Sequence, residues 1–445
     1  LQTFKSRIRR CFQLLIRITN KFMKWNKYTQ IISSTVSFFL FNALHKTCIE
    51  FDVRLCSLFD NLDELQNTHP EFYEQLVKSM FIIPDNYDEV TTCIALKSQE
   101  LLSNKSLRIT INPTLDCNLR CWYCYESHLK GSVMDSDTIK RTLDFIEKRL
   151  KSQHLTCLQL SFFGGEPLLK YNKVIKEIIY KAKELCERFN TSFQLAFTTN
   201  GVCLSSKIVD DLISLTNHVS IQVAFDGGKD AHNNVKHFPN GKGCYDIVLK
   251  NLTYAIDHGV LTTIRCNYTN ESILSFRGLM DDFRFAWKRD NFRFSFHKVW
   301  QEIESESLQE KREKIKTYVG ASNVKSNINS NLGDSLYPCC FDYDHNILIN
   351  YNGDIFKCTA RDFKPEHRIG YLSHYGEIIY NDNLHLDFKS SLTTDCFDCK
   401  LLPICTICLQ QRREAKNHCP YPETKVHAEA NIEKYFHYCP VKVDK

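Results

Sequence analysis

The chain has 445 residues, of which 43% are hydrophobic and 24% are charged, and its formal net charge is +5. This composition is that of a soluble globular protein with room for two or three domains. The small net charge gives no case for a nucleic-acid partner. No membrane span is expected, because the longest apolar stretch near the N-terminus, residues 31–44, is interrupted by polar residues and is too short.

Cysteine is the unusual residue, with 21 copies. The chain is large, its cysteines are clustered, and it shows no signal peptide. Reduced, metal-bound thiols are therefore expected rather than disulfides. This expectation implies a cytoplasmic location.

Residues 1–22 carry lysines and arginines but no acidic residue. That composition is typical of a transit peptide or of a basic helix on a membrane surface. The alternative, which we favour, is that Met23 is the native start and that 1–22 are a basic leader or upstream extension.

Residues 23–96 are expected to form a small module without metal-ligand spacing. Strands are predicted at 37–41 and 47–51, and helices at 53–62 and 70–80. This order suits a winged-helix-like, peptide-binding module that takes up an extended peptide along a strand edge. A helical cap on the next domain is the alternative.

Residues 97–305 alternate between strand and helix patterns. Strands are predicted at 107–112, 157–163, 192–199, 220–225, 262–267 and 291–297. Amphipathic helices are predicted between them at 137–151, 172–190, 205–215, 245–258 and 273–288. Such alternation implies an α/β fold with a parallel sheet and right-handed crossovers, closed here as a partial (β/α)6 barrel.

The unusual residues of this region follow the predicted strands. In chain order the first four strands are followed by Cys117, Cys121 and Cys124, by Gly164-Gly165-Glu166-Pro167, by Thr198-Thr199-Asn200-Gly201, and by Asp226-Gly227-Gly228. Motifs scattered at random would not share one edge of the sheet. Because chemistry in such barrels takes place on the loops after the strands, the sequence predicts an active site there.

The three cysteines form a C-x3-C-x2-C run from Cys117 to Cys124. Iron–sulfur cubes are normally held by four thiolates, so three can leave the fourth iron of a [4Fe–4S] cluster open to a small molecule. A zinc knuckle or buried thiols are the alternatives. The spacing, with Tyr123 before the last cysteine and the Gly-Gly-Glu-Pro run after the second strand, resembles the signature of radical S-adenosylmethionine (SAM) enzymes.

The resemblance covers about residues 108–300 and implies that SAM chelates the open iron and is cleaved to a 5′-deoxyadenosyl radical. The cofactor-binding residues that it implies are Tyr123, Gly164, Gly165, Glu166, Pro167, Asn200, Asp226, Arg265 and Asn267. The glycines allow close backbone approach, and the Glu166 carboxylate can receive the ammonium group. Polar packing inside the barrel is the alternative for the last four. Related chains often place an arginine where this chain has Lys236, which lacks the bidentate fork.

A predicted helix and linker at 306–335 lead to a second cysteine region at 336–445. Its pattern resembles the SPASM extension of radical SAM peptide and protein maturases, which carries two auxiliary [4Fe–4S] clusters. The resemblance implies a first auxiliary cluster on Cys340, Cys358 and Cys408, with Cys339 as the candidate fourth ligand, and a second on Cys396, Cys399, Cys405 and Cys419. Together with the cluster on the triad, three clusters are expected.

The second region departs from the family pattern in its spacing. Two residues separate Cys405 from Cys408 where the family usually has three. Adjacent Cys339 and Cys340 cannot easily both bind one cube, and Cys439 competes with Cys419. Two structural zinc ions would also use eight cysteines.

A radical SAM barrel with a SPASM extension implies an enzyme that oxidatively modifies a peptide or protein. The expected substrate is a ribosomally made precursor peptide with a leader, which receives a thioether or carbon–carbon crosslink. A reducing partner such as ferredoxin or flavodoxin is expected to supply electrons.

Three other functions remain open. An anaerobic sulfatase maturase forms formylglycine, but such enzymes commonly have an aspartate where this chain has Thr359, and they lack an N-terminal module. A peptide epimerase usually needs a cysteine hydrogen donor, for which Cys203 or Cys244 could serve. A non-catalytic iron–sulfur scaffold would bind peptide only, and the retention of the cysteine triad with Glu166 argues against it.

Overall fold

The computed structural model describes residues 23–33, 38–102, 105–328, 339–381, 389–415, 419–420, 422, 432, 435–436 and 442–443. The expectations for residues 1–22 and for Cys439 lie outside these residues. The chain divides into two compact units, each built from segments that are distant in sequence. We call them the terminal unit (1–102, 334–342 and 385–445) and the barrel unit (103–333 and 343–384).

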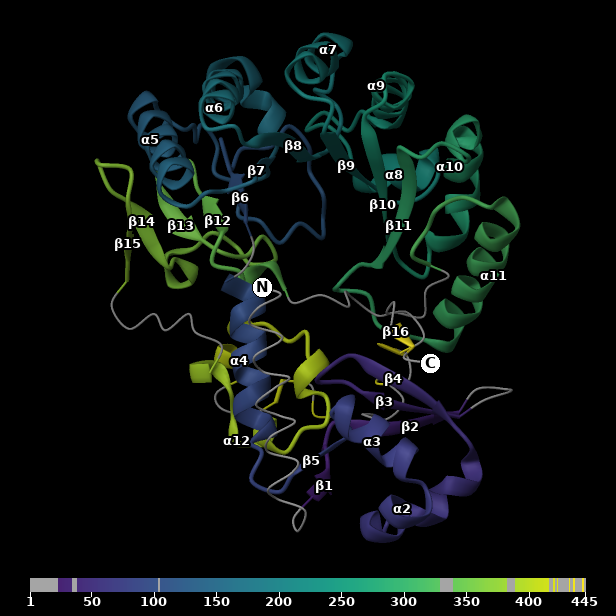
Figure 1. Cartoon of the computed structure of the whole chain (residues 1–445). Coiled ribbons are helices and arrows are strands. Elements are labelled where there is room, and N and C mark those ends of the chain that lie inside the picture. The colour runs from purple at the N-terminus through teal and green to yellow at the C-terminus, as the bar shows by residue number, and fades with distance from the viewer. Residues whose placement is uncertain are drawn as a thin grey trace. The chain divides into compact units, whose positions relative to one another are not determined.

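The barrel unit is built on a curved row of six parallel strands (Figure 1). In sheet order these are β11 (Phe292–Lys298), β10 (Leu261–Tyr268), β9 (Val219–Phe225), β8 (Ser192–Thr199), β7 (Cys157–Phe162) and β6 (Ser106–Ile111). Each neighbouring pair is parallel. The strand predictions for this region are therefore confirmed, with differences of one residue at most of the ends.

Helices cover the outer side of this row of strands (Figure 1). They are α5 (Ser136–Ser152), α6 (Lys176–Arg188), α7 (Ser206–Leu215), α9 (Tyr245–Asp257) and α10 (Phe276–Asp282). Shorter elements extend or link them: η2 (Pro167–Lys170), η3 (Tyr171–Ile175), α8 (Lys229–Val235), η4 (Ile273–Ser275) and η5 (Arg284–Ala286). The helix predicted at 273–288 is thus divided into three short helices.

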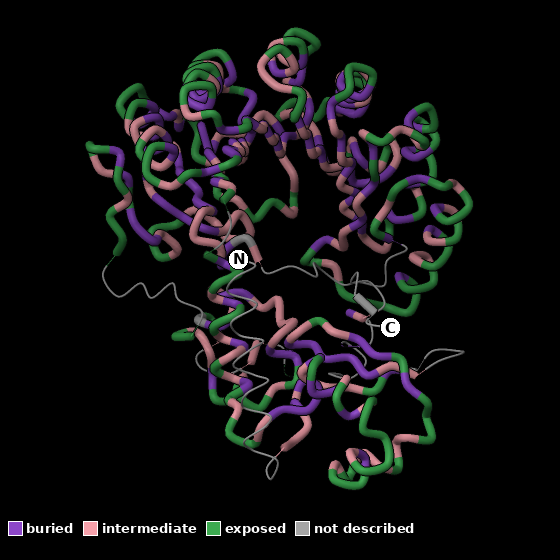
Figure 2. Tube along the Cα trace, viewed as in Figure 1, coloured by how far each residue is buried: buried purple, intermediate pink, exposed green. Residues whose placement is uncertain are grey.

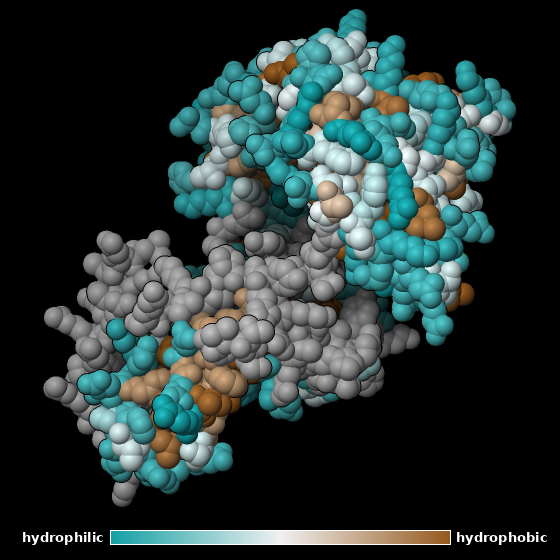
Figure 3. All heavy atoms as spheres, turned by 90° about the vertical axis from the view of Figure 1, so that its right-hand side faces the viewer, coloured by the Kyte–Doolittle hydropathy of each residue, from teal (hydrophilic) through white to brown (hydrophobic). Residues whose placement is uncertain are grey.

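The core of the barrel unit lies between the strands and these helices (Figure 2). Along β10 buried and half-buried residues alternate, so Ile264 and Cys266 face one side while Arg265 and Asn267 face the other. Helix α11 (Glu306–Ser322) begins at the Ser305 N-cap. The side of the barrel unit that carries α10 and α11 is mainly hydrophilic (Figure 3).

The sheet continues beyond β6 with strands that follow α11 in the sequence. β12 (Asn346–Ile349) pairs with β6 in parallel. Three antiparallel strands complete the ten-stranded sheet: β13 (Asp354–Phe356), β14 (Gly370–Leu372) and β15 (Ile378–Tyr380). The short helix η7 (Pro365–His367) lies between β13 and β14 in the sequence.

The terminal unit contains a four-stranded sheet with the order β16-β4-β3-β2. Its strands are β2 (Thr29–Ser33), β3 (Phe38–Asn42), β4 (Thr47–Phe51) and β16 (Lys442–Val443). A smaller antiparallel pair joins β1 (Met23–Trp25) to β5 (Ile82–Pro84). The helices that follow or link these strands are η1 (Val53–Leu58), α2 (Leu62–Thr68), α3 (Pro70–Lys78) and α4 (Glu89–Leu102).

Two predicted limits in this unit differ from the structure. The helix predicted at 53–62 is the 3-10 helix η1, and a separate α2 begins at Leu62, because Asn61 caps it by accepting the N–H of Glu64. Helix α4 also continues through the predicted module end at residue 96.

The cysteine-rich part of the terminal unit consists of short helices and loops. They are η6 (Cys340–Asp342), η8 (Lys389–Ser391), α12 (Thr394–Phe397), η9 (Leu402–Ile404) and α13 (Leu409–Glu414). Among the residues described in both units, no helix combines the length and the apolar character that a membrane crossing requires.

Candidate functional site

The cysteine triad lies on the loop after β6. Cys117 and Cys121 are half-buried and Cys124 is exposed. The N–H of Leu119 lies 3.5 Å from Cys117 Sγ, and Asn200 Nδ2 lies 3.8 Å from the same sulfur. Burial raises the pKa of Cys117 to about 12. This thiol therefore keeps its proton at neutral pH until a metal displaces it.

The glycine pair after β7 packs directly against the start of the cysteine loop. A Cβ atom on Gly164, whose φ is +100°, would lie 2.4 Å from the carbonyl oxygen of Thr114. A Cβ on Gly165 would lie 2.3 Å from the carbonyl oxygen of Asp116. The N–H of Glu166 donates to that same oxygen at 2.8 Å. Only glycines allow the two loops to approach this closely.

Replacing Gly165 with alanine is therefore expected to displace the cysteine loop. We expect Gly165→Ala to lower the free energy of unfolding by about 1–3 kcal/mol, because the clash is with backbone atoms that cannot rotate away. It should also reduce the iron bound after reconstitution. Gly278→Ala is the matched control, since nothing lies within 4 Å of its Cβ position. Equal denaturation midpoints for the two variants would contradict the prediction.

Glu166 is a buried carboxylate held between two loops. It is 0% exposed and accepts hydrogen bonds from Leu168 N (3.0 Å), Thr199 Oγ1 (2.7 Å) and Asn200 N (2.7 Å). Burial raises its pKa to about 7, although these hydrogen bonds oppose the shift. A carboxylate has about four acceptor sites, so one remains for a cationic ligand.

The raised pKa of Glu166 predicts a pH-dependent affinity for a ligand with an ammonium group. Below pH 7 the carboxyl group becomes neutral and cannot pair with the cation. We therefore expect the SAM affinity, measured by equilibrium dialysis, to fall by up to about tenfold per pH unit below 7. Glu166→Gln should bind weakly with little pH dependence. An unchanged slope in that variant would assign the proton to another group.

A second polar cluster is centred on Asp226, after β9. Its carboxylate accepts from Tyr123 Oη (2.5 Å) and from Lys236 Nζ (2.8 Å). Lys236 also donates to Tyr123 Oη (2.7 Å), and Asn267 Nδ2 lies 3.1 Å from that oxygen. Arg265 Nε donates to Asn267 Oδ1 (3.0 Å). The structure thus brings together four residues predicted separately, with Lys236 as their buried cation.

Burial disfavours the charged form of Lys236. The Asp226 carboxylate and the Tyr123 hydroxyl outweigh that effect, so its pKa lies well above the ordinary value. Lys236 is 5% exposed. In place of the arginine of related chains, this chain therefore has a lysine that forms a buried ion pair with Asp226.

Asn200 belongs to the Glu166 group rather than to the Asp226 cluster. Its Nδ2 donates to Asn118 Oδ1 (2.7 Å), and its Oδ1 accepts from Val202 N (3.0 Å). Its backbone N–H donates to Glu166 Oε2. Pro167 begins the 3-10 helix η2, which Glu166 caps.

Sequence reasoning missed two residues beside the triad. Glu126 Oε2 is buried and has no hydrogen-bond partner among the described residues, and burial, followed by the charge of Glu166, raises the pKa of Glu126 to about 7. Tyr125 Oη donates to the carbonyl of Thr359 (2.6 Å), and its ring stacks on Trp300 with centroids 5.3 Å apart. Only the proximity of Tyr125 and Glu126 to Cys124 in the sequence could have drawn attention to them.

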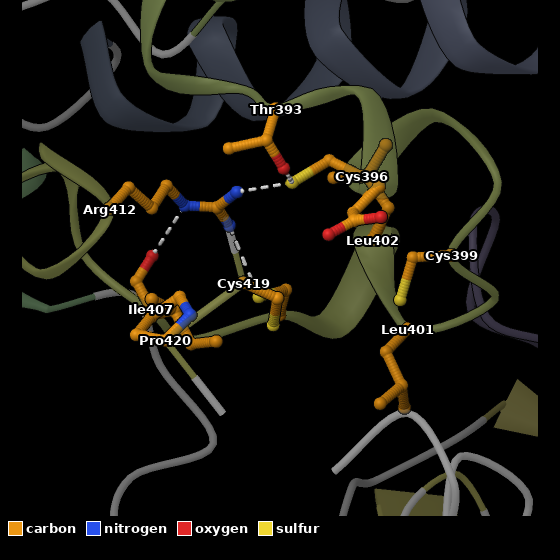
Figure 4. A pocket seen from close by; sticks show the side chains of 11 residues that line it. Thr393, Cys396, Cys399, Leu401, Leu402, Ile407, Arg412, Cys419 and Pro420 are labelled. Atoms are coloured by element: carbon orange, nitrogen blue, oxygen red, sulfur yellow. Dashed lines mark hydrogen bonds between the residues drawn. The ribbon is translucent and has the colours of Figure 1, made fainter. Parts of the chain in front are cut away.

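In the terminal unit a pocket gathers four of the predicted cluster ligands (Figure 4). Its lining includes Cys396, Cys399, Cys405 and Cys419. The buried Arg412 lies among them and donates to the sulfurs of Cys396 and Cys405. The predicted second auxiliary set is therefore assembled around a cation that the cysteine spacing did not reveal.

The other predicted ligands are divided between the two units. In the terminal unit Cys339 and Cys408 lie together: a hydrogen bond with Cys339, followed by burial, raises the pKa of Cys408. Cys340 begins η6, and its side chain lies outside the described part of the structure. In the barrel unit Cys358 follows β13, and its sulfur accepts from the N–H of Ala360 (3.3 Å).

The cysteines of the triad and of the pocket are donors of the type that an iron–sulfur cluster uses. Within the described residues, no three His, Cys, Asp or Glu side chains converge closely enough to hold one metal ion.

A curved parallel sheet with a cysteine triad and a buried glutamate at its carboxyl edge defines the radical SAM class of protein. Residues 111–282 match the model of the radical SAM superfamily. The chain therefore carries a radical SAM domain.

The sequence relatives include a sulfatase-maturating enzyme and uncharacterized proteins. The cysteine-type anaerobic sulfatase-maturating enzyme of Clostridium novyi is 24% identical over 341 residues, covering 70% of this chain and 89% of that protein. An uncharacterized protein of Methanocaldococcus jannaschii is 28% identical over 160 residues, 35% of this chain and 52% of its own length. That match spans about half of the relative.

Solved structures share the fold over most of the chain. SuiB of Streptococcus suis bound to its precursor peptide SuiA has a TM-score of 0.52 at 18% identity, covering 89% of this chain and 98% of that one. Histidine-tagged anSMEcpe with bound AdoMet has a TM-score of 0.53 at 17% identity, covering 75% and 96%. These likenesses show a shared fold over most of the chain, and the central parallel sheet confirms the predicted α/β fold class.

Proposed function

We propose that this protein is a radical SAM enzyme that oxidatively modifies a ribosomally made precursor peptide, forming a thioether or carbon–carbon crosslink. The observation that carries the proposal is the assembly of Cys117, Cys121, Cys124 and the buried Glu166 at one edge of the sheet. A likeness of fold to a protein crystallised with its precursor peptide, over 89% of this chain, supports the substrate class.

The residues around the cysteine triad, which we call the front site, have distinct roles in this proposal. When bound, a [4Fe–4S] cluster with SAM supplies a 5′-deoxyadenosyl radical that abstracts hydrogen from an unactivated carbon. Cys117, Cys121 and Cys124 hold that cluster, and Glu166 accepts the SAM ammonium. Gly164 and Gly165 keep the two loops in contact. Asn200, Asp226, Arg265 and Asn267, with Tyr123, line the remaining SAM site.

The cysteines of the second region hold two auxiliary clusters in this proposal, as assigned from the family pattern. A ferredoxin or flavodoxin would supply electrons. The proposed domains are a module at 23–96, the barrel at 97–305, a helix and linker at 306–335, and the SPASM domain at 336–445. Helix α4 crosses the first of these limits, and residues 343–384 of the last domain belong to the barrel unit.

The leader of the precursor peptide is proposed to bind the module at 23–96. In the four-stranded sheet β2 is the last strand, and it pairs only with β3 among the described residues. The outer edge of β2 therefore offers backbone N–H and C=O groups to an added strand. An extended leader can use them without any change in the sheet.

Sulfatase maturation is the second candidate, because a sulfatase-maturating relative aligns over 70% of this chain. Thr359 argues against it, since a threonine side chain cannot act as the carboxylate base expected after Cys358. The carbonyl of Thr359 accepts a hydrogen bond from Tyr125, so the segment around Thr359 is held to the loop that carries the cysteine triad. Crosslink formation remains the better supported reaction.

The mass of a treated peptide tests the function. A candidate precursor peptide and a cysteine-containing sulfatase peptide are each incubated anaerobically with reconstituted enzyme, SAM and reductant in deuterated buffer, and quenched into light water. Crosslinking removes about 2 Da, and formylglycine formation from cysteine about 18 Da. A retained gain of about 1 Da means epimerisation, with Cys203 or Cys244 as the donor. Absence of SAM cleavage would overturn the radical mechanism.

A further inference from the structure

The cysteine pocket of the terminal unit contains a buried cation that contacts two of its sulfurs (Figure 4). Arg412 Nη1 donates to Cys396 Sγ (2.9 Å), and Nη2 donates to Cys405 Sγ (3.2 Å). Arg412 is only 4% exposed, and its Nε donates to the carbonyl of Ile407 (3.1 Å). One guanidinium therefore spans both sulfurs in a fixed orientation, and hydrogen bonds from an ionised donor are strong.

A second cation and an unsatisfied hydroxyl lie beside the same cysteines. Lys97, on α4, is buried, and its Nζ donates to the carbonyl of Cys405 (3.1 Å). Tyr28 is 1% exposed, and among the described residues its hydroxyl has no hydrogen-bond partner. Burial, followed by charges that include Cys93 and Cys399, raises the pKa of Tyr28.

The charges in this pocket match those of an iron–sulfur cluster. A [4Fe–4S] cluster with a 2+ core and four thiolates has a net charge of about −2. Arg412 and Lys97 together supply the opposite charge when both are protonated. Asp395 also lines the pocket but is only partly buried. Glu100 also acts on Lys97. The two cations beside the cysteines would stabilise an anionic centre in this pocket.

We propose that Arg412, with Lys97 beside it, positions the Cys396 and Cys405 thiolates of the second auxiliary cluster and raises the reduction potential of that cluster. This inference rests on the proposed function, because it requires a cluster on these cysteines. The reduced cluster carries one more negative charge than the oxidised one. Nearby cations, and hydrogen bonds donated to the cluster's sulfurs, stabilise that added negative charge. One-electron reduction of the cluster therefore becomes easier.

The consequence concerns the electron that an oxidative crosslink leaves behind. Closing a bond on a substrate radical releases one proton and one electron, and the electron needs an acceptor. An auxiliary cluster held by these cysteines would supply that acceptor. Arg412 makes this cluster a better acceptor without contacting the peptide, which is why it is a positioning residue rather than a catalytic one.

The test measures the potential of the auxiliary clusters alone. Full-length protein carrying Cys117→Ala, Cys121→Ala and Cys124→Ala is reconstituted with iron and sulfide, and the reduced clusters are followed by EPR during a potentiometric titration. Arg412→Gln and Arg412→Lys are compared in that background. Lys27→Gln is the matched control. Lys27 Nζ donates to the carbonyl of Phe397 (2.6 Å), between Cys396 and Cys399, and not to a sulfur.

We expect Arg412→Gln to lower the equilibrium constant for reduction of one cluster at least tenfold, which corresponds to about 59 mV for a one-electron couple. Arg412→Lys should lower it less, and Lys27→Gln should leave it unchanged. Unchanged potentials in Arg412→Gln with intact clusters would overturn the inference. If Arg412→Gln loses a cluster, the potential of Arg412→Lys is used instead, and an unchanged potential in that variant overturns the inference. If the background protein binds no cluster at all, the auxiliary clusters of the proposed function are themselves overturned.

Discussion

Replacing Cys117, Cys121 and Cys124 together with alanine is expected to abolish the formation of 5′-deoxyadenosine and to leave the fold intact. The three thiols lie on a loop, half-buried or exposed, so their loss removes little core packing. Without them no iron remains to bind and reduce SAM, and the rate should fall to background. Chromatographic measurement of deoxyadenosine and circular dichroism check the two halves of this prediction.

The control replaces two cysteines that are not predicted ligands. Cys56→Ala and Cys157→Ala should retain SAM cleavage, because neither residue is on a strand-end loop: Cys56 is in η1 and Cys157 is at the start of β7. Deoxyadenosine formation that survives in the triple variant would refute the assignment of the front cluster.

Replacing Lys236 with methionine should produce the largest loss of stability. Lys236 is 5% exposed and pairs with Asp226, which is 2% exposed, at 2.8 Å. Removing one partner leaves an uncompensated buried charge, so the free energy of unfolding should fall by about 3–5 kcal/mol. Urea denaturation of the reconstituted protein measures the change.

Two further variants separate the ion pair from other effects. Lys229→Met breaks an exposed pair with Asp246 at the same distance, 2.8 Å, and should cost no more than about 1 kcal/mol. Adding Asp226→Asn to Lys236→Met removes the stranded charge and should restore much of the loss. A double variant that is less stable than Lys236→Met would mean that the pair does not explain the effect.

The parallel sheet and the site edge could be predicted because local pattern and topology agree there. Alternating apolar residues define strands such as β8, and strands in parallel necessarily bring their carboxyl ends to one edge. The glycines and Glu166 therefore had to lie near the triad. Their mutual contacts through Thr114 and Asp116 depend on backbone geometry that a motif does not contain.

The partners of the cationic groups could not be predicted, since they are distant in the sequence. Lys236 stood out only as a departure from the family's arginine. It follows α8, and only the fold places it between Tyr123 and Asp226. Arg412 is one basic residue in the polar helix α13, and only the fold places it against Cys396 on α12. Likewise β12 is too short to identify as a partner of β6 from sequence alone.

The pairing of β12 with β6 also determines how this chain can be shortened. β6, which leads into the cysteine loop, is bonded on one side by β7 and on the other by β12. A protein cut after residue 328 would keep every residue of the front site but would expose one full edge of β6 to solvent. Such an edge invites association between chains. A fragment that keeps the cysteine triad without this exposed edge therefore has to extend through β12. The segment after α11 thus covers the edge of the barrel's first strand.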